Sequence, residues 1–361
     1  MQALVLQEKE SIAVMDVPRP VLTDGQALIQ VSHCGICGSD VRYYYGDNPW
    51  AKQTLGKHLP NPPNIILGHE FTGIVDDVFN KKDAALIGKR VGVNTFITCG
   101  HCAYCRSGRE NLCDATRHLG HGAGWGKMEF YPGGMAELCP AFANQIYELP
   151  AHVTNEQAVF LDPLITALHV VDTAQLQPAD RVVILGAGPI GLLIAQVARQ
   201  AGAAWIGITD ISDNNINIAR QTGADAAWNI ARQSADIVAL VMHETDNFGV
   251  DVVCNTVGTS DSISDAMAML AKSGRQILLA TKDDNIQFPA HLITGERTLK
   301  TSSNALYSDF PLAIAMVAES KVQVEPLITH RYTLTDALQA FDTACNKDTT
   351  GAIKVIVECQ A

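Results

Sequence analysis

The chain has 361 residues, of which 47% are hydrophobic and 18% charged, so it can build the cores of two globular domains. Its 26 basic and 38 acidic residues give a net charge of −12, which argues against nucleic acid as a partner. The N-terminal run reaches Glu8 before any apolar segment of signal-peptide length forms. We therefore expect a cytoplasmic protein that binds neither nucleic acid nor membrane.

The N-terminal half is punctuated by glycines and contains short runs with strand-like alternation of apolar and polar residues. These runs predict a compact, mostly antiparallel β domain with strands at Ala27–Ser32, Phe71–Val78 and Lys89–Val93.

Two fragments of this half carry possible metal ligands. Cys37 lies in the run HCGICGSD and His69 in the run GHE. With a carboxylate they would supply the roughly three protein ligands of a catalytic zinc, which keeps one position open. Because Cys34 and Cys37 also form a C-x2-C pair, binding of one metal by these two cysteines is an alternative.

Four cysteines follow in the run CGHCAYCRSGRENLC, with the spacing C-x2-C-x2-C-x7-C. The loop 99–113 thus supplies four thiolates, enough to close a tetrahedral shell around one zinc ion. A closed shell has no free position, so this zinc would be structural. Its ligands would be Cys99, Cys102, Cys105 and Cys113. Disulfides are the alternative, disfavoured because neighbours this close strain most pairings and cytosolic thiols stay reduced.

From about residue 180 strands and helices alternate, which predicts a doubly wound parallel sheet with helices on both faces. The predicted elements are strands at Arg181–Leu185, Trp205–Thr209, Val250–Cys254 and Gln276–Ala280 and a helix at Asn214–Gln221. The most apolar stretch, 182–198, contains three glycines and a proline. It therefore predicts a buried strand and helix, and not a membrane span.

A glycine-rich turn, GAGPIG, joins the first of these strands to the helix after it. Strand, GxGxxG and helix in this order predict a dinucleotide site. Gly186 permits the tight turn, Gly188 lets the backbone approach a pyrophosphate, and Gly191 lets the helix pack on the strand. Pro189 and Ile190 begin that helix, whose free N–H groups favour phosphate.

Asp210 ends the next strand, WIGIT, about twenty residues further on. A carboxylate there binds both ribose hydroxyls and repels a 2′-phosphate, and no Lys or Arg follows before Arg220. The sequence therefore predicts NAD over NADP.

The pattern changes again after about Thr301. A helix at Pro311–Ala318 leads to the LITHRY segment, and a helix at Thr335–Cys345 leads to a final strand at Ala352–Glu358. Periodicity does not say whether this tail returns to the first domain.

Four motifs, CGICGSD, LGHEFTG, the four-cysteine loop and LGAGPIG, stand in the order found in zinc-containing medium-chain dehydrogenases. The chain resembles that family over nearly its whole length, including the tail LITHRYTLTDALQAF. It is most similar to the polyol branch, which includes sorbitol dehydrogenase. The resemblance implies a Rossmann coenzyme domain at 163–300. It also implies a discontinuous, mostly β GroES-like catalytic domain at 1–162 and 301–361, which carries the zinc loop 99–113.

The resemblance also implies roles for single residues. Cys37 and His69 match two ligands of the catalytic zinc, and Glu70 matches a carboxylate that binds the metal directly or after rearrangement. Asp162 stands where the polyol branch has glutamate, as a ligand or a water-mediated partner. Ser39 matches the hydroxyl that takes the substrate proton.

Other matched positions surround these. Asp40 matches a carboxylate oriented toward the zinc histidine, and Lys354 a cation near that aspartate. Tyr43 matches a pocket tyrosine of sorbitol dehydrogenase. Arg42 replaces the histidine that ends the proton relay of other alcohol dehydrogenases, and Ala305 replaces an arginine that helps to hold the polyol.

The implied activity is oxidation of a secondary alcohol of a polyol, sugar or diol to a ketone, with zinc as Lewis acid and hydride transfer to NAD. A threonine-type or cyclitol dehydrogenase is an alternative within the family. A zinc-stabilised NAD-binding protein without turnover is an alternative outside enzymes. We expect two zinc ions per chain, one catalytic and one structural, and a homotetramer or homodimer. The loop 118–134 adds His121, Trp125 and Phe130 as candidates for substrate contact.

Overall fold

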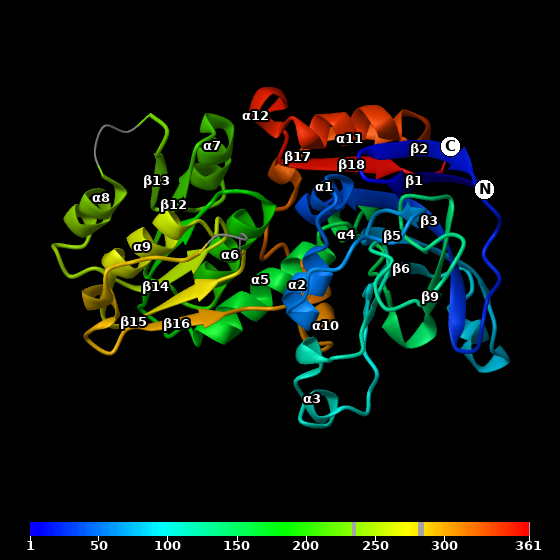
Figure 1. The fold of residues 1–361 in the computed structure, drawn as a ribbon, viewed down its shortest axis with the longest axis horizontal. Helices are drawn as coiled ribbons and strands as arrows, with labels where there is room; N and C mark the ends of the chain where they lie inside the picture. Colours follow the sequence, from blue (N-terminus) through cyan, green and yellow to red (C-terminus); the bar gives the residue numbers. More distant parts are fainter. Residues whose placement is uncertain (233–235, 281–284, 361) are drawn as a thin grey trace. The chain divides into compact units, whose positions relative to one another are not determined.

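The computed structural model describes residues 1–232, 236–280 and 285–360 (Figure 1). The chain forms two compact units. The first contains residues 1–162, 306–319 and 327 to the C-terminus, and the second contains 163–305 and 320–326.

The second unit is built on a parallel sheet with the order β13-β12-β11-β14-β15-β16. Its strands are β11 (Arg181–Leu185), β12 (Trp205–Asp210), β13 (Ala226–Asn229), β14 (Val250–Asn255), β15 (Leu270–Leu278) and β16 (Thr298–Thr301). Val182, Val183 and Ile184 are fully buried, because a parallel sheet is covered on both faces. The order is the one that dinucleotide-binding folds use.

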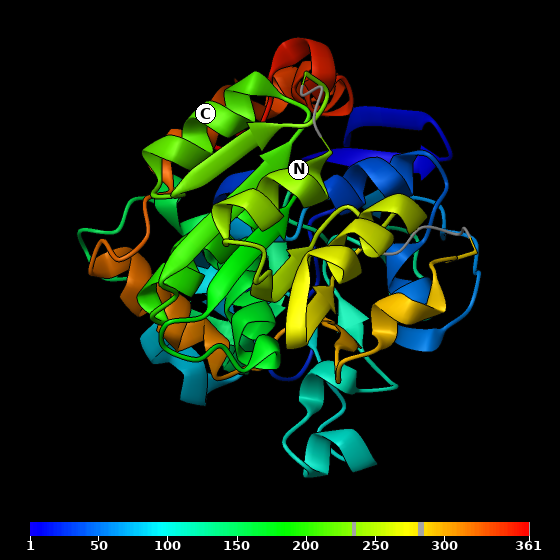
Figure 2. The same ribbon diagram turned by 90° about the vertical axis from the view of Figure 1, so that its left-hand side faces the viewer.

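Helices cover this sheet on either side, as the green and yellow ribbons of Figure 2 show. They are α6 (Pro189–Gln200), α7 (Asp213–Gln221), α8 (Ile237–Glu244) and α9 (Ser260–Met269), with most of α5 (Leu161–Ala174). The apolar stretch 182–198 is therefore a buried strand and helix, as predicted. Among the residues that the structure describes, no helix combines the length and apolarity needed to cross a bilayer.

The first unit is organised around β3 (Gln26–Ile36), which pairs with three strands. β5 (Glu70–Val78) runs antiparallel along one side of it. On the other side, β9 (Leu138–Phe142) pairs with its first half and β18 (Lys354–Glu358) with its second half. Because β18 comes from the end of the chain, the tail joins the same sheet as the N-terminal strands.

Further strands and helices complete this unit. Its other strands are β1 (Gln2–Glu8), β2 (Ser11–Asp16), β4 (Ile65–Ile66), β6 (Arg90–Val93), β7 (Phe96–Ile97), β8 (Arg117–His118), β10 (Ile146–Glu148) and β17 (Ile328–Thr333). Its helices are α1 (Gly38–Tyr44), α2 (Pro49–Leu55), α3 (Ala103–Arg106), α4 (Asn155–Ala158), α10 (Asp309–Ala318), α11 (Ala337–Cys345) and α12 (Lys347–Thr350). One hydrophobic core runs from β1 and β3 to α11 and β18.

The predicted fold class, a Rossmann unit with a mostly β second domain, is confirmed. The bounds of the two units differ from the predicted ones at two segments. Residues 301–305 and 320–326 belong to the second unit. The first segment begins at the last residue of β16, which pairs with β15. The second is held by the Gln323 N–H, which donates to Gln196 Oε1 at 2.6 Å.

Candidate active site

Three residues with different ligand atoms converge where β3 ends and β5 begins. Gly35 on β3 lies opposite Glu70 on β5, so Cys37, just past the end of β3, comes next to His69 and Glu70. A thiol sulfur, a ring nitrogen and a carboxylate oxygen lie within 4.8 Å of one another. Sulfur, nitrogen and oxygen donors in this number and spacing suit a zinc ion with an open position.

Asp40 holds Cys37 and His69 in place. It is fully buried, and its carboxylate accepts the Cys37 N–H at 2.8 Å and the Gly68 N–H at 3.3 Å. Its Oδ1 also lies 3.5 Å from His69 Nδ1. A carboxylate on one side of the ring directs the other nitrogen, Nε2, outward, which is how histidine ligands of metals are usually oriented.

Glu70 is held by Lys354, which reaches it from the far end of the chain. The two form a buried ion pair, and each residue is only 1% exposed. Burial opposes the charged ammonium, but Glu70 outweighs burial and keeps the pKa of Lys354 above its ordinary value. Asp40 also acts on Lys354 and contributes to raising its pKa, so the predicted cation near Asp40 is present, and its ion-pair partner is Glu70.

Gly35 makes room for this pair. A side chain there would begin 2.4 Å from Glu70 Oε2 and 2.7 Å from Val159 Cγ1, so only glycine fits. Cys34 is fully buried and does not join the group of possible ligands, so the structure gives no support for a metal held by Cys34 and Cys37.

Asp162 lies close by but outside the group of three. Burial raises the pKa of its carboxyl to about 6, with smaller effects from His69 and Glu70. The Thr95 hydroxyl donates to it at 3.4 Å. The acidic side chains of Asp40, Glu70 and Asp162 thus lie near two basic side chains, His69 and Lys354.

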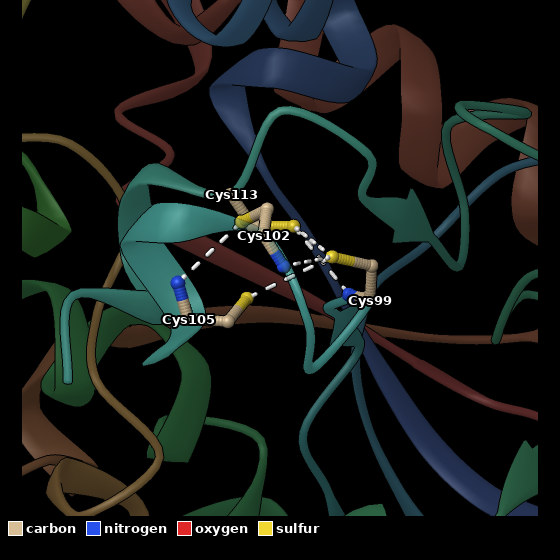
Figure 3. A group of neighbouring side chains, drawn as sticks. All are labelled: Cys99, Cys102, Cys105 and Cys113. Carbon is tan, nitrogen blue, oxygen red and sulfur yellow. Dashed lines mark hydrogen bonds between the residues drawn. The ribbon is translucent and has the colours of Figure 1, made fainter. Parts of the chain in front are cut away.

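The four cysteines of the loop 99–113 point toward one centre (Figure 3). Cys99 Sγ lies 3.5 Å from Cys113 Sγ and 4.0 Å from Cys105 Sγ, close to the roughly 3.8 Å between thiolates of a tetrahedral zinc site. All ten cysteines of the chain are free, so none of these sulfurs is in a disulfide. The Cys105 N–H is the main cause that lowers the pKa of Cys102 to about 6, which favours the thiolate.

The glycine-rich turn of the second unit has the geometry of a phosphate-binding loop. Gly186 has a positive φ of +96°, and a side chain on Gly191 would begin 1.9 Å from the Gly186 carbonyl oxygen. A side chain on Gly188 would meet nothing within 4 Å, which leaves open space above the start of α6. Pro189 and Ile190 form the first turn of that helix.

Asp210 lies at the end of β12, beside this turn. Its carboxylate accepts the Ala187 N–H at 2.7 Å and the Ser212 N–H at 2.9 Å, which holds it in one orientation. Arg220, the first cation after Asp210, donates instead to the Ala227 carbonyl at 2.8 Å.

Known proteins resemble this chain in both halves. Residues 23–151 match the alcohol dehydrogenase GroES-like domain, and residues 189–319 match the zinc-binding dehydrogenase domain. A probable D-xylulose reductase A of Aspergillus clavatus is 31% identical over 94% of this chain and 92% of its own length. The chain belongs to the zinc-containing medium-chain dehydrogenase family.

Other relatives agree with this assignment. The sorbitol dehydrogenase of Halalkalibacterium halodurans is 32% identical over 99% of both chains. The L-threonine 3-dehydrogenase of Deinococcus radiodurans is 32% identical over 95% of this chain and 94% of its own. The structure of alcohol dehydrogenase TADH from Thermus sp. ATN1 superimposes with a TM-score of 0.85 at 30% identity, over the whole of both chains. This dehydrogenase is thus a zinc-type oxidoreductase of the polyol branch, as predicted.

In this dehydrogenase Ser39 lies on the partly exposed side of the ligand group. Its Oγ is 3.4 Å from His69 Nε2 and 3.5 Å from His121 Nε2. The His121 ring stacks on His118 at 4.2 Å and meets His69 edge-on at 4.3 Å. Burial lowers the pKa of His118 to about 3 and that of His121 well below its ordinary value, so both rings are neutral.

Sequence reasoning named His121 only as one of three possible contacts and passed over His118. The H-x2-H spacing within a glycine-rich loop is the signal that would have singled them out. Trp125 and Phe130 lie elsewhere in the first unit. Trp125 stacks on Phe142, and Phe130 packs against a small cluster that contains Val5, Val17 and Ile66.

Two other residues matched to the family, Tyr43 and Arg42, contact neighbouring side chains of the protein. Tyr43 is fully buried, and its hydroxyl donates to Asn48 Oδ1 at 3.2 Å while its ring stacks on His121. Arg42 pairs with Asp47 at 2.5 Å. The substrate contact that the resemblance implied for Tyr43 stays a prediction.

Proposed function

We propose that the protein oxidises a secondary alcohol of a polyol, sugar or diol to a ketone, with NAD as the hydride acceptor. The observation that carries the proposal is the convergence of Cys37, His69 and Glu70 beside the Ser39 hydroxyl. A bound metal can lower the pKa of an alcohol hydroxyl, and a hydroxyl beside it can take the proton.

Cys37 and His69 would hold a catalytic zinc, with Glu70 or Asp162 as the carboxylate of the set. When bound, zinc supplies Lewis-acid chemistry that lowers the pKa of an alcohol hydroxyl. Asp40 keeps the His69 ring in place through its carboxylate. Lys354 forms an ion pair with one oxygen of the Glu70 carboxylate and so holds that side chain in place. The second zinc would be structural, held by the four cysteines of the loop 99–113.

Ser39 would accept the proton of the substrate hydroxyl, because it is the hydroxyl next to the ligand group. Its contacts of 3.4 and 3.5 Å are long, as catalytic hydrogen bonds often are before substrate binds. Arg42 is bound to Asp47, and a guanidinium has no acceptor atom, so it does not carry the proton further.

Replacing Ser39 by alanine should lower kcat by about a hundredfold or more, because the proton acceptor is lost. Steady-state rates with the best alcohol check this, with Ser32→Ala on β3 as a matched control that keeps normal turnover. A loss in Ser39→Ala of less than about threefold would remove Ser39 from this role.

The coenzyme would bind with its pyrophosphate over Gly188 and its adenosine ribose at Asp210. We expect kcat/KM to be higher for NAD than for NADP, because Asp210 faces the position of a 2′-phosphate. Asp210→Ser should lower the ratio of kcat/KM for NAD to kcat/KM for NADP by about tenfold or more. Equal or better use of NADP by the unmodified protein would contradict the assignment.

The substrate class is tested by following nicotinamide absorbance with zinc-loaded protein, NAD and a panel of alcohols. The panel contains sorbitol, xylitol, butane-2,3-diol, myo-inositol and L-threonine. The proposal predicts the highest kcat/KM for a polyol or diol.

Threonine oxidation is the second candidate, since L-threonine 3-dehydrogenases are as similar to this chain as the polyol enzymes are. A highest kcat/KM for L-threonine would favour it. Absence of NAD reduction with every alcohol would favour a zinc-stabilised NAD-binding protein without turnover.

A further inference from the structure

His121 is a buried imidazole beside the proposed proton acceptor that the mechanism above does not use. It is 7% exposed, its Nδ1 has no hydrogen-bond partner, and its Nε2 faces Ser39 Oγ. The ring therefore offers Nε2 to a ligand while no protein group fixes the proton on Nδ1.

The backbone holds this ring firmly in position. Gly120 has a φ of +80°, and a side chain there would begin 2.4 Å from the Gly68 carbonyl oxygen, so the loop packs directly on the residue before His69. The ring itself is stacked between His118 and Tyr43. His118 is fixed in turn, because its Nδ1 lies 2.7 Å from the Leu119 carbonyl oxygen.

Asp40, His69 and His121 also bring ligand atoms within 4.8 Å of one another, which raises the possibility of a second metal. The Asp40 oxygens already accept two backbone N–H groups and face His69 Nδ1. A metal there would have to break the contacts that shape the first ligand group. His121 is therefore better explained as a group that meets the substrate.

We propose that His121 binds the hydroxyl on the carbon next to the one that is oxidised, so that the preferred substrates are vicinal diols. This inference rests on the proposed function and on the role of Ser39 in it. The two oxygens of a vicinal diol are about one hydrogen-bond length apart. A substrate oxygen at Ser39 Oγ therefore brings its neighbour within reach of His121 Nε2, which is 3.5 Å from Ser39 Oγ.

The chemistry of the ring favours a hydroxyl over a charged group at this point. Because Nδ1 has no protein partner, the protein does not lock the tautomer, and Nε2 can either donate or accept. A hydroxyl likewise donates and accepts, so it pairs with either tautomer. The ammonium group of an amino alcohol only donates and pairs with one.

The test compares an alcohol with the same alcohol lacking the neighbouring hydroxyl, for example butane-2,3-diol and butan-2-ol. The protein should have a kcat/KM at least about tenfold higher for the diol, and His121→Phe, which keeps a stacking ring, should remove most of that preference. His121→Gln, whose amide can donate and accept, should restore part of it. Tyr43→Phe, on the other face of the ring, should leave the preference unchanged.

Each outcome decides a different statement. A best substrate without a neighbouring hydroxyl, or a diol preference that survives in His121→Phe within about twofold, would overturn the role of His121. A selective loss in Tyr43→Phe would move the contact to Tyr43. Failure to oxidise any alcohol of the panel would count against the proposed function itself.

Discussion

Replacing Lys354 by methionine should lower the free energy of unfolding by about 3–5 kcal/mol. Lys354 and Glu70 are each 1% exposed and form an ion pair, so removal of the ammonium leaves a carboxylate buried without its cation. Methionine keeps most of the side-chain volume of lysine. The lower free energy of unfolding would therefore come from the lost charge and not from lost packing. Urea unfolding of the zinc-loaded protein measures the difference.

Two further variants separate this effect from a general loss of stability. Adding Glu70→Gln to Lys354→Met should recover most of the loss, because the uncompensated charge is then gone. Lys89→Met removes the same type of side chain from an exposed pair with Glu148, 2.9 Å long with exposures of 45% and 59%, and should cost less than about 1 kcal/mol. A loss below about 1 kcal/mol in Lys354→Met would show that the pair is not buried in solution.

Replacing Cys37 by alanine should lower kcat by more than about a hundredfold. Loss of a residue that only orients a metal ligand already lowers activity by up to about a hundredfold, and Cys37 would be a ligand itself. Cys37 supplies the only thiol of the group with His69 and Glu70. Its backbone N–H stays bonded to Asp40, so the start of α1 should keep its structure. The circular dichroism spectrum should therefore change little, and near-normal turnover would contradict the site.

Much of this arrangement follows from local sequence. The sequence alone predicts β11, the glycine-rich turn and the start of α6, because strand, turn and helix each have their own residue pattern within 181–200. The four-cysteine loop is similarly self-contained, since its ligands lie on one short segment.

The parts that the sequence does not predict depend on pairing between distant segments. Lys354 and Glu70 are 284 residues apart, and it is the pairing of β18 with β3 that brings Lys354 into an ion pair with Glu70. The same holds for His121, whose place beside Ser39 depends on how the loop packs against Gly68. Periodicity and motifs each describe a single segment, so they do not predict contacts between distant segments.

Tyr43 illustrates a different limit. The resemblance matched its position to a substrate-binding tyrosine, but here Asn48 takes its hydroxyl and the ring supports His121. The match in position therefore implies a role for Tyr43 that these two contacts do not test.

The zinc content of the purified protein tests the central claim most directly. The account predicts two zinc ions per chain in the unmodified protein, one in Cys37→Ala, and one in Cys102→Ala, with alcohol oxidation lost in the first variant. One zinc per chain in the unmodified protein, together with full activity in Cys37→Ala, would contradict it.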